Sequence, residues 1–136
     1  MGFFEKNKII TVIGLGYVGL PLALLFSSKY QCIGFDINKN RISDLKKGAD
    51  ITKEHSKKEI LSKKKLRFTS KLEDLKIANI FVITVPTPIT NANNPDLKII
   101  KNATRMVSKV IKKDDIVIFE STVYPGLSEY LAVNIL

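Results

Sequence analysis

Residues 9–19 of this 136-residue chain read IITVIGLGYVG, and this stretch determines the fold that we expect. It places a Gly-x-Gly-x-x-Gly pattern directly after a β-branched apolar run and directly before an apolar helical run. In that position Gly14 permits a tight turn, Gly16 lets the backbone approach a pyrophosphate, and Gly19 lets the helix pack on the strand. The stretch predicts a dinucleotide-binding turn, although glycines alone also suit a purely structural turn or a mononucleotide or flavin site.

Asp36 strengthens the dinucleotide interpretation. It ends the next apolar run, 32–36, at roughly 20 residues after the first glycine, where a carboxylate hydrogen-bonds the hydroxyls of the adenine ribose. An acid there also repels a 2′-phosphate, so the cofactor predicted is NAD rather than NADP. Arg41 weakens this preference, because an arginine can accept the phosphate.

Strand-like and helix-like patterns alternate along the rest of the chain. We expect strands over 9–13, 32–36, 66–69, 80–85 and 116–120, and helices over 18–28, 39–47, 57–62, 96–111 and 126–136. This alternation predicts an α/β fold of the Rossmann type: a doubly wound, mainly parallel sheet with helices on both faces. Ligands of such sheets bind beyond the carboxyl ends of the strands. Gly14, Asp36, Thr87 and residues 120–122 are therefore expected to meet at one crevice.

Composition limits the partners of the chain. The net charge is +9, and residues 39–67 hold eleven Lys or Arg against four Asp or Glu. Because no aromatic residues interleave with these lysines in the manner of single-strand binders, we expect a solvated basic surface and no nucleic acid partner. No apolar run approaches the ~20 residues that cross a bilayer, and no signal peptide is evident, so we expect a cytoplasmic protein without a membrane partner. The single cysteine, Cys32, should be a buried thiol, and the lone His55 has no ligand partners, so no metal site is predicted.

Three segments together resemble one family. They are GLGYVGLP at 14–21, VPTP at 85–88 and ESTVYPG at 120–126. In this order and spacing they resemble the amino-terminal domain of the UDP-glucose/UDP-mannuronic acid dehydrogenase family, the nucleotide-sugar 6-dehydrogenases. The form of the third segment, with Asp36-Ile37-Asn38 upstream, is most similar to members that act on UDP-N-acetylglucosamine or UDP-N-acetylgalactosamine in capsule or O-antigen synthesis.

The resemblance implies an activity and a set of site residues. Its members oxidise the C6 alcohol of the sugar to a carboxylate in two steps, using two NAD⁺. The position of Thr122 lies beside the reacting centre, so Thr122 is the predicted catalytic residue. Without the resemblance, Thr87 and Thr122 fit the structural roles of a helix cap and a turn hydroxyl equally well. Arg41 likewise fits the role of a solvent-facing cation on a helix. The residues expected to contact NAD are Gly14, Leu15, Gly16, Tyr17, Val18, Gly19, Asp36, Arg41, Val85, Pro86, Thr87 and Thr122.

The resemblance also implies parts that residues 1–136 do not supply. These are a catalytic cysteine, a lysine and an asparagine, a central helix and a UDP-sugar-binding domain. We therefore expect 1–136 to be a truncated NAD-binding domain that binds NAD without turnover, taken from a full-length homodimer that acts on a UDP-sugar. The alternatives are UDP-glucose, UDP-N-acetylmannosamine, or a 3-hydroxyacyl or 6-phosphogluconate-type acid as substrate. A non-enzymatic NAD-sensing or nucleic-acid-binding Rossmann module is the alternative from another class.

Overall fold

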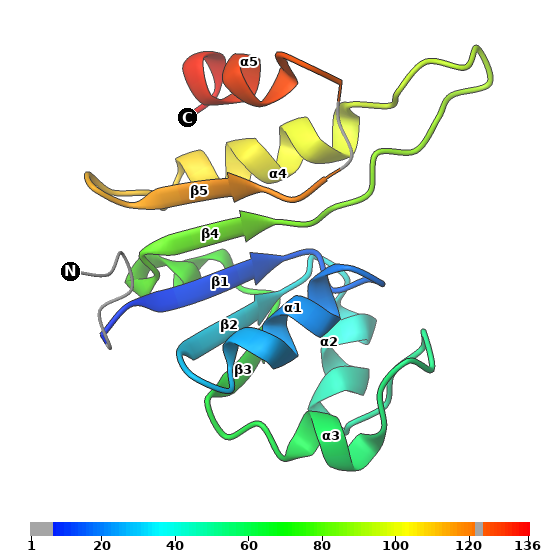
Figure 1. The fold of residues 1–136 in the computed structure, drawn as a ribbon, viewed down its shortest axis with the longest axis vertical. Helices are drawn as coiled ribbons and strands as arrows, with labels where there is room; N and C mark the ends of the chain where they lie inside the picture. Colours follow the sequence, from blue (N-terminus) through cyan, green and yellow to red (C-terminus); the bar gives the residue numbers. More distant parts are fainter. Residues whose placement is uncertain (1–6, 122–123) are drawn as a thin grey trace.

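The computed structural model describes residues 7–121 and 124–136. In these residues a five-stranded sheet forms the centre of the molecule, in the order β3-β2-β1-β4-β5 (Figure 1). All neighbouring strands run parallel. The strands are β1 (Ile9–Ile13), β2 (Gln31–Phe35), β3 (Leu66–Thr69), β4 (Ile80–Ile83) and β5 (Ile116–Phe119). The chain starts in the middle of the sheet, runs to one edge and returns to build the other, which confirms the doubly wound Rossmann-type fold.

The register of the strands aligns their carboxyl ends. Ile13 at the end of β1 pairs with Phe35 of β2 and with Ile83 of β4. Ile83 in turn pairs with Phe119 of β5. The residues that follow these strand ends therefore leave the sheet side by side, and they are Gly14, Asp36, Thr84 and Glu120. Because strand order reverses between β1 and β4, this edge is where a parallel sheet of this kind opens a ligand crevice.

Helices cover both faces of the sheet, as predicted. Helices α1 (Gly19–Phe26), α2 (Lys39–Lys46) and α3 (Lys57–Leu61) pack on one face, where Ile10 and Val12 of β1 point. The other face, which includes Ile13, is covered by the 3₁₀ helix η1 (Leu72–Ile77) and by α4 (Lys98–Ser108) and α5 (Leu127–Asn134). Alternate residues of each strand thus belong to two separate apolar cores.

Sequence-based boundaries differ from the structure by a few residues. The strand expected over 80–85 ends at Ile83, and Pro86, which has no N–H, cannot continue the ladder. The helix expected over 96–111 is shorter, and its start follows a turn in which the side chain of Asp96 accepts the N–H of Lys98 at 3.0 Å. The start of α2 is as predicted, because the side chain of Asn38 accepts the N–H groups of Asn40 and Arg41.

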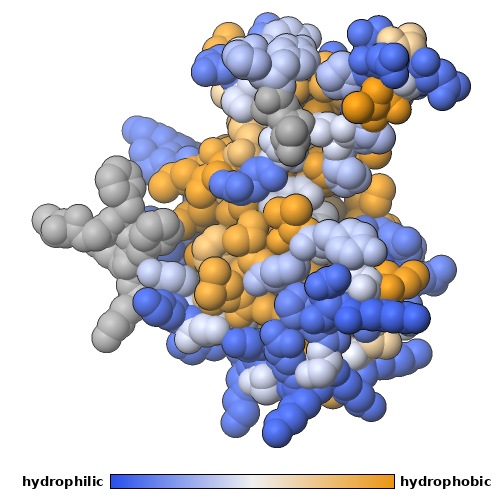
Figure 2. All heavy atoms as spheres, turned by 45° about the vertical axis from the view of Figure 1, so that its right-hand side comes forward, coloured by the Kyte–Doolittle hydropathy of each residue, from blue (hydrophilic) through white to orange (hydrophobic). Residues whose placement is uncertain are grey.

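The surface is divided between polar and apolar regions. Figure 2 shows hydrophilic side chains gathered over the lower part of the molecule, where α2 and α3 lie, and hydrophobic ones across its middle. The basic stretch 39–67 contains both of these helices, and all of its lysines except Lys63 are exposed. Among the described residues, no helix has the length and apolar character needed to cross a membrane.

Candidate dinucleotide-binding site

The turn after β1 depends on two of its glycines. Gly14 has a φ of +92°, a conformation that side chains disfavour, and its N–H donates to the carbonyl of Phe35 at 2.9 Å. A Cβ on Gly19 would overlap the carbonyl oxygen of Gly14 and lie 2.5 Å from Oγ1 of Thr84. The hydroxyl of Thr84 itself lies 2.9 Å from the carbonyl oxygen of Ile13 and 2.7 Å from that of Gly14. The close approach of α1 to this turn therefore requires glycine at position 19.

The third glycine, Gly16, faces open space. A Cβ built on it meets no atom within 4 Å, so the backbone is accessible from the outside. No side chain caps the N-terminus of α1 at Val18, whereas Asn38 caps α2. An uncapped helix N-terminus presents unpaired N–H groups, which are suited to an anion such as a pyrophosphate. The residues here fit a dinucleotide, and α1 rather than α2 is the helix that fits its phosphates.

Asp36 is tied to the glycine turn. Its Oδ2 accepts the N–H of Leu15 at 3.0 Å and its Oδ1 accepts the N–H of Asn38 at 2.9 Å. These bonds fix the carboxylate at the mouth of the turn, and each oxygen keeps lone pairs for further donors. The half-buried carboxylate is thus oriented to accept ribose hydroxyls.

The strand ends meet at one crevice, and of the residues expected to converge there the structure brings together Gly14, Asp36, Thr87, Glu120 and Ser121. The crevice has a volume of about 380 Å³. The Ser121 hydroxyl donates to the carbonyl of Val85 at 2.7 Å and so joins the end of β5 to the end of β4. Thr122, the predicted catalytic residue, lies outside the described residues. The residues lining the crevice are Gly14, Leu15, Gly16, Tyr17, Val18, Asp36, Thr84, Val85, Pro86, Thr87, Glu120 and Ser121. Of these, Thr84, Glu120 and Ser121 were not among the predicted cofactor contacts.

Arg41 is not the solvent-facing cation that its place on an exposed helix suggested. It is only 8% exposed. Its Nε donates to the carbonyl of Leu15 at 2.9 Å, and its Nη1 forms an ion pair with Oδ1 of Asp50 at 2.9 Å. The guanidinium therefore supports the glycine turn from the side of α2. Asp36 accepts the backbone N–H of Leu15, and Arg41 donates to its carbonyl. The Nη2 atom of Arg41 is buried and has no hydrogen-bond partner among the described residues.

Asp50 holds Arg41 in this position. The Asp50 side chain is fully buried, and besides Arg41 it accepts the N–H and the hydroxyl of Thr52 and the N–H of His55. Burial alone would raise the pKa of Asp50, but the hydrogen bonds from Thr52 and Arg41 and the charge of Arg41 outweigh it and lower the pKa below its ordinary value. Asp50 is therefore a charged acceptor. Asp50 was not among the predicted site residues, because a lone Asp after a helix is typical of a turn.

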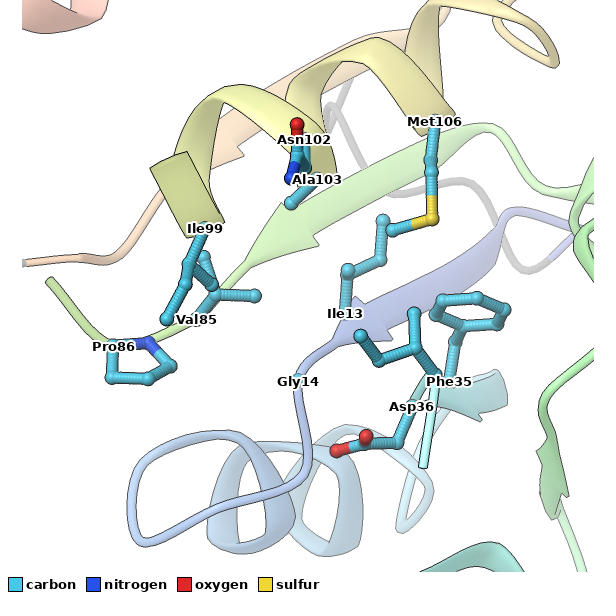
Figure 3. Close-up of a pocket in the computed structure, with 11 residues that line it drawn as sticks. Ile13, Gly14, Phe35, Asp36, Val85, Pro86, Ile99, Asn102, Ala103 and Met106 are labelled. Atoms are coloured by element: carbon cyan, nitrogen blue, oxygen red, sulfur yellow. The ribbon is translucent and has the colours of Figure 1, made fainter. Parts of the chain in front are cut away.

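A second hollow of about 260 Å³ adjoins the crevice on the side of α4. Figure 3 shows it between Ile99 and Met106 of α4, Val85 and Pro86 after β4, and Phe35 and Asp36 at the end of β2. Its walls are mostly apolar, with Asp36 at one side. Such a slot beside the Asp36 carboxylate fits a flat aromatic base. None of the α4 residues that line it, Ile99, Asn102, Ala103 and Met106, was among the predicted cofactor contacts, because they reach the end of β2 from a helix far along the chain.

The isolated reactive groups lie away from this site. Cys32 is buried in β2, and burial raises the pKa of its thiol to about 12, as expected for an inert core cysteine. Nδ1 of His55 lies 3.1 Å from Oε1 of Glu59. Within the described ranges, no group of three or more His, Cys, Asp or Glu residues could hold a metal ion.

Comparison with known proteins places the chain in a family. Residues 8–136 match the model of the UDP-glucose/GDP-mannose dehydrogenase family, NAD binding domain. The chain is 48% identical over 131 residues to the UDP-N-acetyl-D-glucosamine 6-dehydrogenase of Pseudomonas aeruginosa, covering 96% of this chain and 31% of that protein. It is also 48% identical over 127 residues to the enzyme of the same name from Salmonella typhi, covering 93% and 30%.

A solved structure agrees with these matches. The UDP-D-ManNAc dehydrogenase of Pyrococcus horikoshii superposes with a TM-score of 0.85 at 40% identity, over 93% of this chain and 31% of that one. The chain thus spans about a third of the length of the relatives it matches. The matched third is the part of the family that binds NAD.

Proposed function

This chain belongs to the UDP-glucose/GDP-mannose dehydrogenase family, and we propose that it is the NAD-binding part of a longer UDP-N-acetylhexosamine 6-dehydrogenase. The observation that carries the proposal is the position of the Asp36 carboxylate, bonded to Leu15 beside an uncapped α1 and an open Gly16. These groups together offer a ribose acceptor and a pyrophosphate cradle.

Each part of the dinucleotide has a matching set of residues. The pyrophosphate lies at Gly16, Tyr17, Val18 and the start of α1. The adenine-side ribose bonds to Asp36, and the adenine occupies the apolar slot beneath Ile99 and Met106. The nicotinamide end lies toward Val85, Pro86 and Thr87. From the family resemblance, we propose Thr122 as the residue that acts beside the reacting centre.

NAD bound in this way supplies an acceptor for the hydride that leaves C6 of the sugar. Oxidation of an alcohol to a carboxylate releases two hydrides, so two NAD⁺ are reduced for each sugar, and water supplies the added oxygen. The residues of this chain bind and orient the cofactor: beside the crevice, the hydroxyls of Thr84 and Ser121 join the ends of β1, β4 and β5 to one another. The sugar nucleotide and the catalytic thiol belong, in this proposal, to parts of the enzyme outside residues 1–136.

The substrate proposed is UDP-N-acetylglucosamine, because the two 48% identical relatives carry that name. The 40% identical structure is named for UDP-D-ManNAc, and that sugar is the nearest alternative. The cytoplasmic location expected from the sequence and the homodimeric assembly implied by the resemblance are part of this proposal.

The test is an assay of an enzyme that contains this chain and has the length of its relatives. Supplied with NAD and one UDP-sugar at a time, it should form two NADH for each UDP-N-acetylglucosamine consumed, with a kcat/KM above those for UDP-N-acetylmannosamine and UDP-glucose. Equal or higher kcat/KM for UDP-glucose would reject the substrate. No NADH with any nucleotide sugar would reject the activity.

A further inference from the structure

Resting on NAD as the cofactor of the proposed function, we propose that Asp50 is a cofactor-specificity residue, which prevents Arg41 from acting as a receptor for the 2′-phosphate of NADP. Asp50 acts through Arg41 and not by touching the cofactor.

Arg41 is well placed to meet a 2′-phosphate. A hollow of about 300 Å³ on the outer side of the glycine turn is lined by Asp36, Asn38 and Arg41, together with Gly16 and Asp44. Asp36 is the residue expected to hold the ribose, so a group on the 2′-oxygen of that ribose enters the hollow that Arg41 lines. The guanidinium also has a buried Nη2 with no partner among the described residues. An arginine near the ribose-binding acid is the usual means of accepting a 2′-phosphate.

The hydrogen bonds of Arg41 prevent it from binding a 2′-phosphate in this way. Nη1 donates to Asp50 at 2.9 Å and Nε to the carbonyl of Leu15 at 2.9 Å, so two of the three guanidinium nitrogens already donate to the protein. Bidentate binding of a phosphate needs two parallel N–H groups on one edge, and only Nη2 is uncommitted.

Charge acts in the same direction. The hollow is lined by the carboxylates of Asp36 and Asp44, and the buried carboxylate of Asp50 neutralises the one cation among its lining residues. A phosphate that carries nearly two negative charges is therefore repelled. Removal of the Asp50 charge both lowers this repulsion and releases Nη1.

The ion pair is itself fixed. Oδ2 of Asp50 accepts the hydroxyl of Thr52 at 2.7 Å and the N–H of His55 at 3.2 Å, so the carboxylate cannot swing away from Arg41 without losing these bonds. Thr52 therefore offers a milder way to loosen the pair than a change of Asp50 itself.

The experiment measures the dissociation constants of NAD and NADP by calorimetry on the 136-residue chain and on a set of variants. Asp50→Asn should lower the ratio of the NADP constant to the NAD constant by about tenfold, the effect of a new charged hydrogen bond. Thr52→Val, which leaves the charge in place, should lower the ratio in the same direction by a smaller factor. Asp44→Asn removes one carboxylate from the same hollow without touching the ion pair, and should change the ratio less than Asp50→Asn does.

The double variant Asp50→Asn/Arg41→Gln separates this role from general loosening of the fold. If Asp50 acts through Arg41, the gain in NADP binding disappears in the double variant. The proposal is overturned if Asp50→Asn leaves the ratio unchanged, if Asp44→Asn has an equal effect, or if the gain persists without Arg41. If Asp50→Asn does not fold, an unchanged ratio in Thr52→Val overturns it. A folded wild-type chain that binds no NAD would instead overturn the proposed function.

Discussion

The Oδ2 atom of Asp36 accepts the backbone N–H of Leu15 at 3.0 Å, and Leu15 lies between the first two glycines of the turn. The acid that we propose to bind the ribose is thus also a structural support of the loop that we propose to bind the pyrophosphate. A change at Asp36 should affect both.

We predict that Asp36→Ala weakens NAD binding by about tenfold or more, because charged hydrogen bonds to the ribose are lost. It should also lower the free energy of unfolding by about 1 kcal/mol, because Leu15 loses its acceptor. Calorimetry and urea denaturation measure the two effects. The exposed acid Glu54 offers a control, and Glu54→Ala should alter neither quantity. NAD affinity that survives in Asp36→Ala contradicts the assignment of the ribose site.

Substitution by alanine should affect stability at one glycine of the turn and NAD binding at another. Gly19→Ala should destabilise the fold by about 3 kcal/mol, because its Cβ would overlap the carbonyl of Gly14. Gly16→Ala should change stability by less than about 0.5 kcal/mol, because nothing lies within 4 Å of its Cβ. Gly16→Ala should nevertheless weaken NAD binding by about tenfold or more, because its methyl group occupies the space of the pyrophosphate. Undiminished binding in a folded Gly16→Ala chain would show that the phosphates lie elsewhere.

The buried pair of Asp50 and Arg41 should make stability depend on pH. The pKa of Asp50 in the fold is lowered, so its ionised form stabilises the fold above the unfolded pKa of about 4, and this stabilisation is lost as the pH falls through the folded pKa. Asp50→Asn should cost about 3 kcal/mol at neutral pH, since it leaves the Arg41 charge without its counterion. The difference in unfolding free energy between wild type and variant should shrink on acidification below about pH 4. A difference that is the same in acid and at neutral pH counts against the ionised state assigned to Asp50.

Cys32 should be unreactive in the folded chain. With a thiol pKa of about 12 and a side chain buried in β2, it should resist an aromatic disulfide reagent at neutral pH and react at once in denaturant. The absorbance of the released aromatic thiol measures both rates. Rapid, stoichiometric labelling of the native protein is the opposite result, and it would place the thiol at the surface.

The fold followed from the sequence because its signals were local. The apolar run of β1, the glycines after it and the Asn38 cap of α2 each specify backbone geometry within a few residues. Element ends were less certain: β4 ends at Ile83, and at the next residue the hydroxyl of Thr84 contacts the carbonyl oxygens of Ile13 and Gly14, which are far away in the sequence. Periodicity carries no information on such a contact.

The glycines of the turn and Asp36 could be predicted from the sequence as candidate site residues. The residues that hold them in place could not. Arg41 has the helical position of a surface cation, and only the long-range approach of Asp50 and Leu15 buries it. The apolar slot under α4 was likewise missed, because Ile99 and Met106 line it from a helix far along the chain. Residues that act through long-range tertiary contacts form no recognisable spacing pattern in the sequence, so they cannot be found from it.

The central claim, that the crevice around Gly16 and Asp36 binds NAD, is tested most directly by titration of the folded 136-residue chain with NAD and with NADP in a calorimeter. We predict saturable binding of NAD at one site per chain, weaker binding of NADP, and loss of the NAD signal in Asp36→Ala and Gly16→Ala. A folded chain that gives no binding heat with NAD, and no NAD-dependent rise in Tm, would contradict the account.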